Sequence, residues 1–413
     1  MAATTVETLK IGKIEVPLIA EEDGTLPIIS MQLVFSASGA IMDGKHPGLA
    51  ALSADLLEEG TKKLGSVAFA RELEERAIRL NVDAGRETFV FELSALKEQF
   101  EPGLKLLIDL LKEPNLTPET LEKIKGQSIG ELQRRESDFD YVASRGLSGL
   151  MYEGTPLEHP SQGTVQSVQA ITLEQIAAFL KTALVQERAI VLFGGDFNRT
   201  QAHEWSRKLV GALGSGQRAE LPKIEAIKTP KEKLITRESE QAYVYFGSPF
   251  YMDAADDEAY KATVASYILG GGGFGSRIME EVRVKRGFAY SAHGRVNLGL
   301  SSSSFRGHLQ TKPENREAAT VVVKEVIAEF VKKGVSEKEL KEAKQFLLGA
   351  EPLRTETMSQ RLSRAFNDFY RGKELGWSQS QLAKIETLSV KELNAFIAAH
   401  PEILELSFFV VTK

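Results

Sequence analysis

The sequence predicts an α+β fold composed of two tandem homologous domains, each a mostly antiparallel sheet covered on one face by helices. Three observations lead to this prediction. Segments with alternating apolar residues, typical of strands, occur together with segments whose apolar residues recur at helical spacing. Similar segments recur in the two halves of the chain. A stretch rich in Gly, Ser, Pro and Lys, residues 211–234, separates the halves and has the composition of a linker.

The strand and helix patterns are clearest in the first half. Residues 29–38 and 87–93 alternate as strands with one buried face do. Residues 46–61 instead carry leucines at spacings of three and four, which predicts an amphipathic helix. The residues on the buried faces are Phe89, Phe91 and Leu93 in the second strand, and Leu49, Leu52 and Leu56 in the helix.

Helix starts can also be read in both halves. Thr117 is expected to be an N-cap, and Pro118 occupies the first helical position that follows it. Ser336 is expected to cap the corresponding helix of the second half, with Glu339 completing a capping box. Each half therefore begins this helix with a recognisable signal.

The repeat fixes the expected domain organisation. Residues 116–132 resemble residues 335–351, and residues 168–196 resemble residues 385–413, about 220 residues further along in each case. In both halves a helix, a short turn and a closing apolar strand follow in the same order. The sequence therefore indicates one duplicated α+β unit, and two equal halves of this kind can face each other around a cavity.

We place the domain boundaries accordingly. The N-terminal domain is expected to span residues 1–215 and the C-terminal domain residues 233–413, with a linker at residues 216–232.

The composition is that of a soluble globular protein. Hydrophobic residues make up 42% and charged residues 26% of the 413 residues. The formal net charge is −6, so no basic field indicates nucleic acid or an anionic membrane as a partner. No segment approaches the ~18 uninterrupted apolar residues of a membrane span. The absence of cysteine excludes disulfides, thiol catalysis and cysteine-ligated metals.

The first residues bear on the cellular compartment. Residues 1–18 lack the charged and then apolar pattern of a signal peptide. As given, the chain is therefore expected to be cytoplasmic, or periplasmic if a signal peptide has been removed.

A glycine-rich segment offers the first candidate site. Gly270, Gly272 and Gly275 satisfy G-x-G-x-x-G, the spacing of a dinucleotide-binding turn. However, residues 257–269 before the glycines have a helical pattern, whereas the dinucleotide site needs a strand there, and no acidic residue follows at the required distance. A Walker A motif is also excluded, because Arg277 follows Ser276 where a lysine would be required. The glycines therefore serve another purpose.

Other common sites are absent from the sequence. The six histidines are scattered, no two fall at helical ligand spacing, and no G-x-S-x-G nucleophile elbow occurs. On residue chemistry alone the chain has no active site.

The order of landmarks nevertheless resembles the pitrilysin/insulysin family of zinc metallopeptidases, especially its half-length bacterial and mitochondrial-processing subunits. That family carries H-x-x-E-H on a helix, and residues 48–61 retain the flanking Gly-Leu-Ala and Gly-Thr. Ala51, Ala54 and Asp55 occupy the positions of the first His, the Glu and the second His. Glu131 follows Asp55 at the spacing at which the family places its third ligand.

These substitutions remove the zinc chemistry. Catalytic zinc needs three protein ligands and an open position for water, but Ala51 has no donor atom, so only the carboxylates of Asp55 and Glu131 remain. Ala54 cannot act as the general base for a metal-bound water. We therefore expect no metal and no cofactor in this chain. On residue chemistry, Ala51, Ala54 and Asp55 simply belong to an amphipathic helix.

The same resemblance gives the glycine-rich segment a role. Residues 269–290, LGGGGFGSRIMEEVRVKRGFAY, are similar to the family's second-domain motif. The resemblance implies that Arg283 holds substrate carbonyls and Tyr290 donates to the oxyanion, both in trans on the partner's substrate. It also implies that the substrate is contacted by Gly271, Gly272, Gly273 and Phe274.

A structural alternative for the pair remains open at this point. Arg283 could instead pair with Glu280 or Glu281 on a solvated helix, and Tyr290 could pack in a strand.

The resemblance implies the non-zinc subunit of a heterodimeric peptidase. The expected partner is a homologous H-x-x-E-H subunit carrying the zinc, and the expected substrate is an unstructured peptide. The isolated chain is then no enzyme, although the complex is a hydrolase. An alternative from another class is an inactive scaffold or binding protein like the respiratory-complex core subunits. A third possibility is a substrate-recognition subunit like that of mitochondrial processing peptidase.

Overall fold

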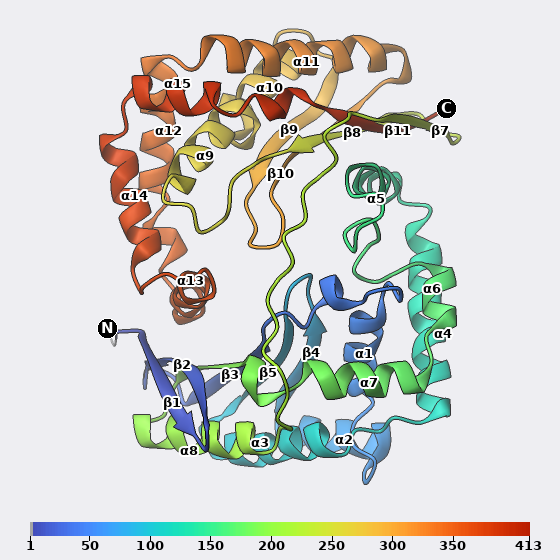
Figure 1. Cartoon of the computed structure of the whole chain (residues 1–413), viewed down its shortest axis with the longest axis vertical. Coiled ribbons are helices and arrows are strands. Elements are labelled where there is room, and N and C mark those ends of the chain that lie inside the picture. Colours follow the sequence, from blue (N-terminus) through green and yellow to red (C-terminus); the bar gives the residue numbers. More distant parts are fainter. Residues whose placement is uncertain (1–2) are drawn as a thin grey trace. The chain divides into compact units, whose positions relative to one another are not determined.

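The computed structural model describes residues 3–413 and divides the chain into two compact units (Figure 1). Unit 1 contains the described chain up to Gln133, together with His159–Pro222 and Arg354–Tyr370. Unit 2 contains Arg134–Glu158, Lys223–Leu353 and Arg371–Lys413. Both units are therefore discontinuous in sequence, which differs from the two continuous domains expected at 1–215 and 233–413.

Unit 1 is built on a six-stranded, mostly antiparallel sheet with the order β1-β2-β6-β3-β5-β4. Only the β2–β6 pair is parallel. The strands are β1 (Thr5–Ile11), β2 (Ile14–Glu22), β3 (Ile28–Phe35), β4 (Arg79–Ala84), β5 (Phe89–Leu96) and β6 (Ala189–Gly195). β3 and β5 confirm the two strands predicted in this half, and Phe89, Phe91 and Leu93 are buried as predicted.

Helices cover this sheet and enclose a core of aromatic and aliphatic side chains. They are α1 (Leu49–Leu57), α2 (Gly65–Glu74), α3 (Lys97–Lys112), α4 (Pro118–Arg135), α6 (Val165–Ala170), α7 (Leu173–Ala183) and α8 (Arg199–Gly211). Short 3₁₀ turns form η1 (Ala40–Met42) and η2 (Gln186–Arg188). The largest fully buried side chain of this core is Trp205. Leu49, Leu52 and Leu56 of α1 all belong to it, so the predicted helix face is confirmed.

Unit 2 repeats this plan with a five-stranded sheet in the order β7-β11-β8-β10-β9. The strands are β7 (Glu232–Thr236), β8 (Ala242–Pro249), β9 (Ala289–Asn297), β10 (Ser304–Thr311) and β11 (Ser407–Thr412). β7 pairs with β11 in parallel, and the other pairs are antiparallel. In both units the closing apolar strand predicted from the repeat, β6 or β11, lies inside the sheet and is buried along its length.

The helices of unit 2 alternate with short turns. They are α9 (Ala259–Ser266), α10 (Arg277–Met279), α11 (Arg316–Lys333), α12 (Glu337–Gly349), α14 (Trp377–Thr387) and α15 (Val390–Ala398). The turns are η3 (Tyr267–Gly271), η4 (Gly273–Gly275), η5 (Glu280–Val284), η6 (Pro313–Asn315) and η8 (Pro401–Leu404), and η7 (Pro352–Arg354) lies at the boundary with unit 1.

The predicted helix caps are present. The Thr117 hydroxyl accepts a hydrogen bond from the Thr120 backbone N–H at 3.2 Å, and α4 begins at Pro118. Ser336 and Glu339 form the complete capping box at the start of α12.

The discontinuity of the two units results from an exchange of one helix in each direction. Helix α5 (Phe139–Met151) comes from the first half of the sequence but packs on β8 and β11 of unit 2. Gly146 permits this close approach, because a Cβ there would lie 2.3 Å from the Phe409 ring. Phe409 and Val411 are buried in the resulting apolar cluster.

Helix α13 (Met358–Tyr370) makes the reciprocal contact. It comes from the second half but packs on β2 and β6 of unit 1, where Leu362 joins Ile19 and Val34 in a separate apolar cluster. Arg361 fixes its orientation by donating to Glu21 Oε1 from Nε at 2.9 Å and from Nη2 at 2.5 Å. Only 1% of the Glu21 side chain is exposed, so this ion pair is a buried and directional contact.

The connection between the halves has little regular structure, in keeping with its composition. Residues 212–231 form no helix and no extended strand. In the part of the chain that the structure describes, no helix is long and apolar enough to cross a membrane.

Candidate functional site: the glycine-rich turn and helix α1

The glycine-rich segment of unit 2 connects α9 to β9. The chain leaves α9 through the π-helical turn η3, passes through η4, and resumes a short helix from Arg277 to Val284. The glycines therefore lie between two helical segments. The helical pattern predicted before the glycines is also confirmed, since α9 and η3 replace the strand that a dinucleotide site would need.

Three of the glycines occupy positions where a side chain would clash or strain the backbone. A Cβ on Gly270 would lie 2.6 Å from the backbone N and O of Gly294 in β9. A Cβ on Gly272 would lie 2.9 Å from the Tyr267 carbonyl oxygen, and Gly273 has a φ of +61°, which side chains rarely adopt. The glycine run therefore lets the turn pack directly against the backbone of β9.

Arg283 lies between two aromatic rings. Its guanidinium carbon is 4.6 Å from the centroid of the Phe274 ring and 4.8 Å from that of the Tyr290 ring. Phe274 is 66% exposed and Tyr290 is 78% exposed, which is unusual for large aromatic residues. The structure thus brings together three of the residues singled out from the sequence, in an arrangement that suits cation–π attraction.

The position of Tyr290 depends on an irregularity in β9. Ser291 pairs with Gln310 and Ala289 pairs with Thr311, so Tyr290 has no partner in β10 and forms a β-bulge. Such bulges redirect a side chain and are common beside functional sites. The bulge explains why Tyr290 does not pack in the strand, which was the structural alternative for it.

The structural alternative for Arg283 is also not realised. Glu281 accepts instead from Lys285 at 2.6 Å and from Arg286 at 2.5 Å. These hydrogen bonds lower the pKa of Glu281. Within residues 3–413, Arg283 itself forms no ion pair, and its neighbours are the two rings.

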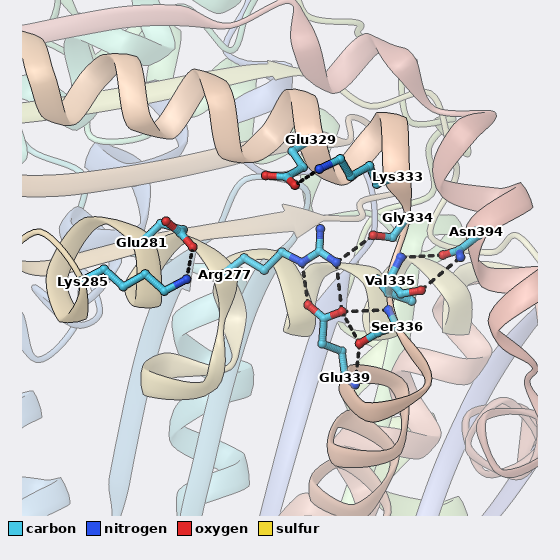
Figure 2. A network of polar contacts seen from close by, with 10 residues as sticks. All are labelled: Arg277, Glu281, Lys285, Glu329, Lys333, Gly334, Val335, Ser336, Glu339 and Asn394. Atoms are coloured by element: carbon cyan, nitrogen blue, oxygen red, sulfur yellow. Dashed lines mark hydrogen bonds and ion pairs between the residues drawn. The ribbon is translucent and has the colours of Figure 1, made fainter.

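Arg277, at the start of the same helical segment, makes a different kind of contact (Figure 2). Its Nε donates to Glu339 Oε1 at 2.6 Å and its Nη2 donates to Glu339 Oε2 at 2.9 Å. Nη2 also donates to the Gly334 carbonyl oxygen at 2.7 Å. Burial favours a raised pKa for Glu339, but the hydrogen bonds from Arg277 and Ser336 outweigh it and hold the pKa at about 2. The motifs in the sequence reveal the capping box of Glu339 but not its second role.

In unit 1, the positions of the missing zinc motif lie on α1. Ala51 is half-buried and Ala54 is 1% exposed, so neither offers a polar atom to a metal. Asp55 keeps access to solvent, and the Ser128 hydroxyl is 3.5 Å from its Oδ2. The α1 frame therefore persists without its ligand set.

The environment of Asp55 is acidic. Partial burial, followed by repulsion from Glu58 and Glu131, raises the pKa of Asp55 to about 6. Among residues 3–413 no group of three His, Asp or Glu side chains is placed to hold a metal ion. Two carboxylates remain of the family's ligand positions, too few for a catalytic zinc site.

Asp43 is a residue of this region that the motifs do not single out. Its carboxylate accepts from the backbone N–H groups of Gly48 and Ala50, each at 2.8 Å, and so satisfies donors at the start of α1. Burial raises its pKa to about 7, although these hydrogen bonds act in the opposite direction. An acidic residue shortly before a helix with a glycine N-cap is the signal that could have identified it.

Comparisons with known proteins agree with this description. Residues 19–165 match the family model described as insulinase (peptidase family M16), and residues 170–347 match the one described as the peptidase M16 inactive domain. The chain is 39% identical over 413 residues to the non-peptidase homolog YmxG of Helicobacter pylori, covering 100% of this chain and 95% of that protein. The name of this relative fits the replaced zinc positions on α1.

More distant similarities point the same way. The crystal structure of a peptidase M16 inactive domain from Pseudomonas fluorescens superposes with a TM-score of 0.89 at 26% identity, covering 98% of both chains. The mitochondrial-processing peptidase subunit beta of Bos taurus is 21% identical over 220 residues, covering 53% of this chain and 45% of that subunit. The resemblance read from residues 48–61 and 269–290 is thus confirmed, and the chain belongs to the M16 (insulinase) peptidase family.

Proposed function

We propose that this chain is the zinc-less subunit of a heterodimeric zinc metallopeptidase and acts on an unstructured peptide held by a homologous H-x-x-E-H partner. The exposed group of Phe274, Arg283 and Tyr290 is the observation that supports this most directly. Within residues 3–413 the Arg283 guanidinium has no carboxylate partner and the Tyr290 hydroxyl has no hydrogen-bond partner. Both groups are therefore available to a second molecule.

The chemistry of the two side chains suits peptide hydrolysis. The Tyr290 hydroxyl would donate to the carbonyl oxygen that becomes an oxyanion, an interaction typically worth about 3 kcal/mol in the transition state. The Arg283 guanidinium would donate to backbone carbonyl oxygens of the same peptide. Because two rings already restrict Arg283, less conformational entropy is lost when the peptide binds. The peptide itself would add as a strand to a sheet edge of the partner.

The separate roles proposed for the two subunits follow from the side chains that α1 lacks. Ala51 and Ala54 leave this chain without a complete ligand set and without a general base. The partner's zinc would supply the activated water, while this subunit would supply hydrogen-bond donors. The isolated chain is then expected to bind no stoichiometric zinc and to hydrolyse no peptide.

A second candidate is an inactive scaffold or binding protein. It is favoured by the name of the Helicobacter pylori relative, which is called a non-peptidase homolog. A neighbouring gene for a protein of similar length with an intact H-x-x-E-H would favour the heterodimer, and the absence of such a gene would favour the scaffold.

The proposal is tested by purifying the full chain from its native source and analysing the metal content of what co-purifies. Zinc should arrive only with a second polypeptide that carries H-x-x-E-H. The reconstituted complex should cleave an internally quenched, unstructured peptide. Arg283→Ala and Tyr290→Phe should each lower kcat/KM by about 100-fold. Phe is the matched replacement for Tyr290, because it removes only the hydroxyl.

Turnover that survives both substitutions would exclude the role in trans and leave the scaffold as the better description. Assembly of the complex, followed by size-exclusion chromatography, serves as the control, since neither side chain is buried in unit 2.

A further inference from the structure

Among residues 3–413, the short helix that carries Arg283 (residues 277–284) forms one ion pair with another element of unit 2. Glu281 also forms ion pairs with Lys285 and Arg286, but both of these partners lie within the helix or the turn after it. The pair of Arg277 with Glu339 instead links the helix to α12, 62 residues further along the chain. Figure 2 shows both kinds of pair in one view.

The Arg277 guanidinium meets two elements at once. It donates to the carbonyl of Gly334, which ends α11, and to Glu339 in the first turn of α12. Its guanidinium carbon is also 5.3 Å from the centroid of the Phe330 ring in the last turn of α11. A planar, two-pronged contact of this kind fixes both distance and orientation, which a single surface ion pair does not.

Glu339 is itself held in place. Its Oε2 accepts from the Ser336 backbone N–H at 2.8 Å and from the Ser336 hydroxyl at 2.7 Å. Asn394 of α15 supports the adjoining residue, because its Oδ1 accepts from the Val335 N–H at 2.7 Å and its Nδ2 donates to the Val335 carbonyl at 3.1 Å. The carboxylate that receives Arg277 therefore sits on a rigid corner between α11 and α12.

We propose that Arg277 and Glu339 are positioning residues that hold the Arg283 helix, and through it the exposed Arg283–Tyr290 pair, in the orientation that substrate requires. This inference rests on the proposed function. The helix is also anchored by the buried apolar side chains of Ile278, Met279 and Val282, which resist its removal from the core. Apolar contacts are non-directional. They therefore fix the rotation of the helix about its axis less firmly than the two-pronged contact of Arg277 with Glu339 does.

The experiment compares two neighbouring glutamates in the full-length chain. Glu339→Gln keeps the shape of the side chain and removes the charge that receives Arg277. Glu329→Gln is the matched control, because Glu329 lies near the same corner and also faces the charge of Arg277, but its ion pair is with Lys333 on its own helix. In the reconstituted complex with the zinc subunit, hydrolysis of the quenched peptide should fall about 10-fold in kcat/KM for Glu339→Gln. It should be unchanged for Glu329→Gln.

A double-mutant cycle separates positioning from general destabilisation. If Glu339 acts through Arg283, then Glu339→Gln should have no further effect on turnover in an Arg283→Ala background. Arg277→Lys should behave like Glu339→Gln, since lysine cannot form the two-pronged contact. An equal loss of turnover with and without Arg283 would overturn the inference, and so would full activity of Glu339→Gln in a complex that needs Arg283.

A measurement without peptide or partner distinguishes this inference from the proposed function. Amide hydrogen exchange of residues 277–290 should speed up at least ~5-fold in Glu339→Gln but not in Glu329→Gln. Faster exchange, with an Arg283→Ala complex that remains fully active, would remove the proposed function and keep the role of Arg277 and Glu339 in ordering the helix. Unchanged exchange would overturn the inference whatever the activity.

Discussion

Helix α1 of unit 1 and the segment from Gly270 to Tyr290 of unit 2 differ in the chemistry of their exposed side chains, although both are well packed. α1 keeps its buried leucine face and its start at Gly48, but its solvent-facing motif positions hold Ala51 and Asp55. The glycine-rich segment keeps both its tight backbone packing and an exposed set of polar and aromatic groups. Packing requirements are therefore satisfied in both regions, while exposed chemistry survives in one. This contrast shows that the buried face of an element and the chemistry of its exposed side chains can vary independently.

The largest expected effect comes from restoring ligands to α1. Ala51→His together with Asp55→His would place two imidazoles one turn apart on the same helix face, near Glu131. With three ligands available, we expect the variant to bind about one zinc ion per chain, where the parent binds none. Metal analysis after dialysis measures this gain, and Ala51→His alone is the control.

The double variant should still hydrolyse no peptide, because Ala54 supplies no base. Failure of the double variant to retain zinc would mean that the α1 frame has changed in more than its side chains.

An intermediate effect is expected from the glycines of unit 2. Gly270→Ala would push a Cβ to 2.6 Å from backbone atoms of Gly294, so the turn or β9 must move. We expect a loss of about 3 kcal/mol in the free energy of unfolding. Gly275→Ala is the matched control, since nothing lies within 4 Å of a Cβ there, and it should change stability by less than about 0.5 kcal/mol. Urea titration of the two variants measures the difference, and equal stabilities would contradict the steric explanation.

The smallest expected effect is the pH-dependent contribution of Asp55 on α1 to the free energy of unfolding. The folded-state pKa of Asp55, about 6, lies above its ordinary value of 3.8, so the folded protein binds this proton more tightly than the unfolded chain. The stability that Asp55 contributes is therefore present below about pH 4 and is lost as pH rises toward 6. Asp55→Asn should be more stable than the parent at pH 7.5 by at most about 1 kcal/mol, because the partly buried side chain keeps access to solvent, which screens its charge.

At pH 4 the two proteins should have the same urea midpoint. Asp43 has a pKa of about 7, so its contribution to the free energy of unfolding also falls between pH 4 and pH 7. Because this happens in both proteins, the test uses the difference in stability between the parent and Asp55→Asn at each pH. A parent that is the more stable protein at pH 7.5 would show that Asp55 makes a favourable contact there.

Much of the fold follows from local patterns in the sequence. Alternation located β3 and β5, leucine spacing located α1, and the capping residues Thr117 and Ser336 located the starts of α4 and α12. These signals are local because strand pleating, helical periodicity and capping each depend on residues a few positions apart. The repeat and the motifs at residues 48–61 and 269–290 were sufficient to identify the family.

Other features were beyond local patterns. An amphipathic helix such as α5 or α13 reveals an apolar face but not the sheet which that face covers, so the exchange between the units could not be read from sequence. The same limit applies to Arg277 and Glu339, whose contact joins two distant segments. The bulge at Tyr290 depends on register with β10, which alternation alone does not fix.

The exchange of α5 and α13 has a consequence for a chain cut between its halves. A protease that cleaved within residues 212–231 would leave two fragments, each holding a helix that belongs to the other fragment's compact unit. Separation would uncover the apolar surface around Phe409 in one unit and leave the carboxylate of Glu21 without its arginine in the other. The nicked protein should therefore migrate as one particle under native conditions and come apart only in denaturant.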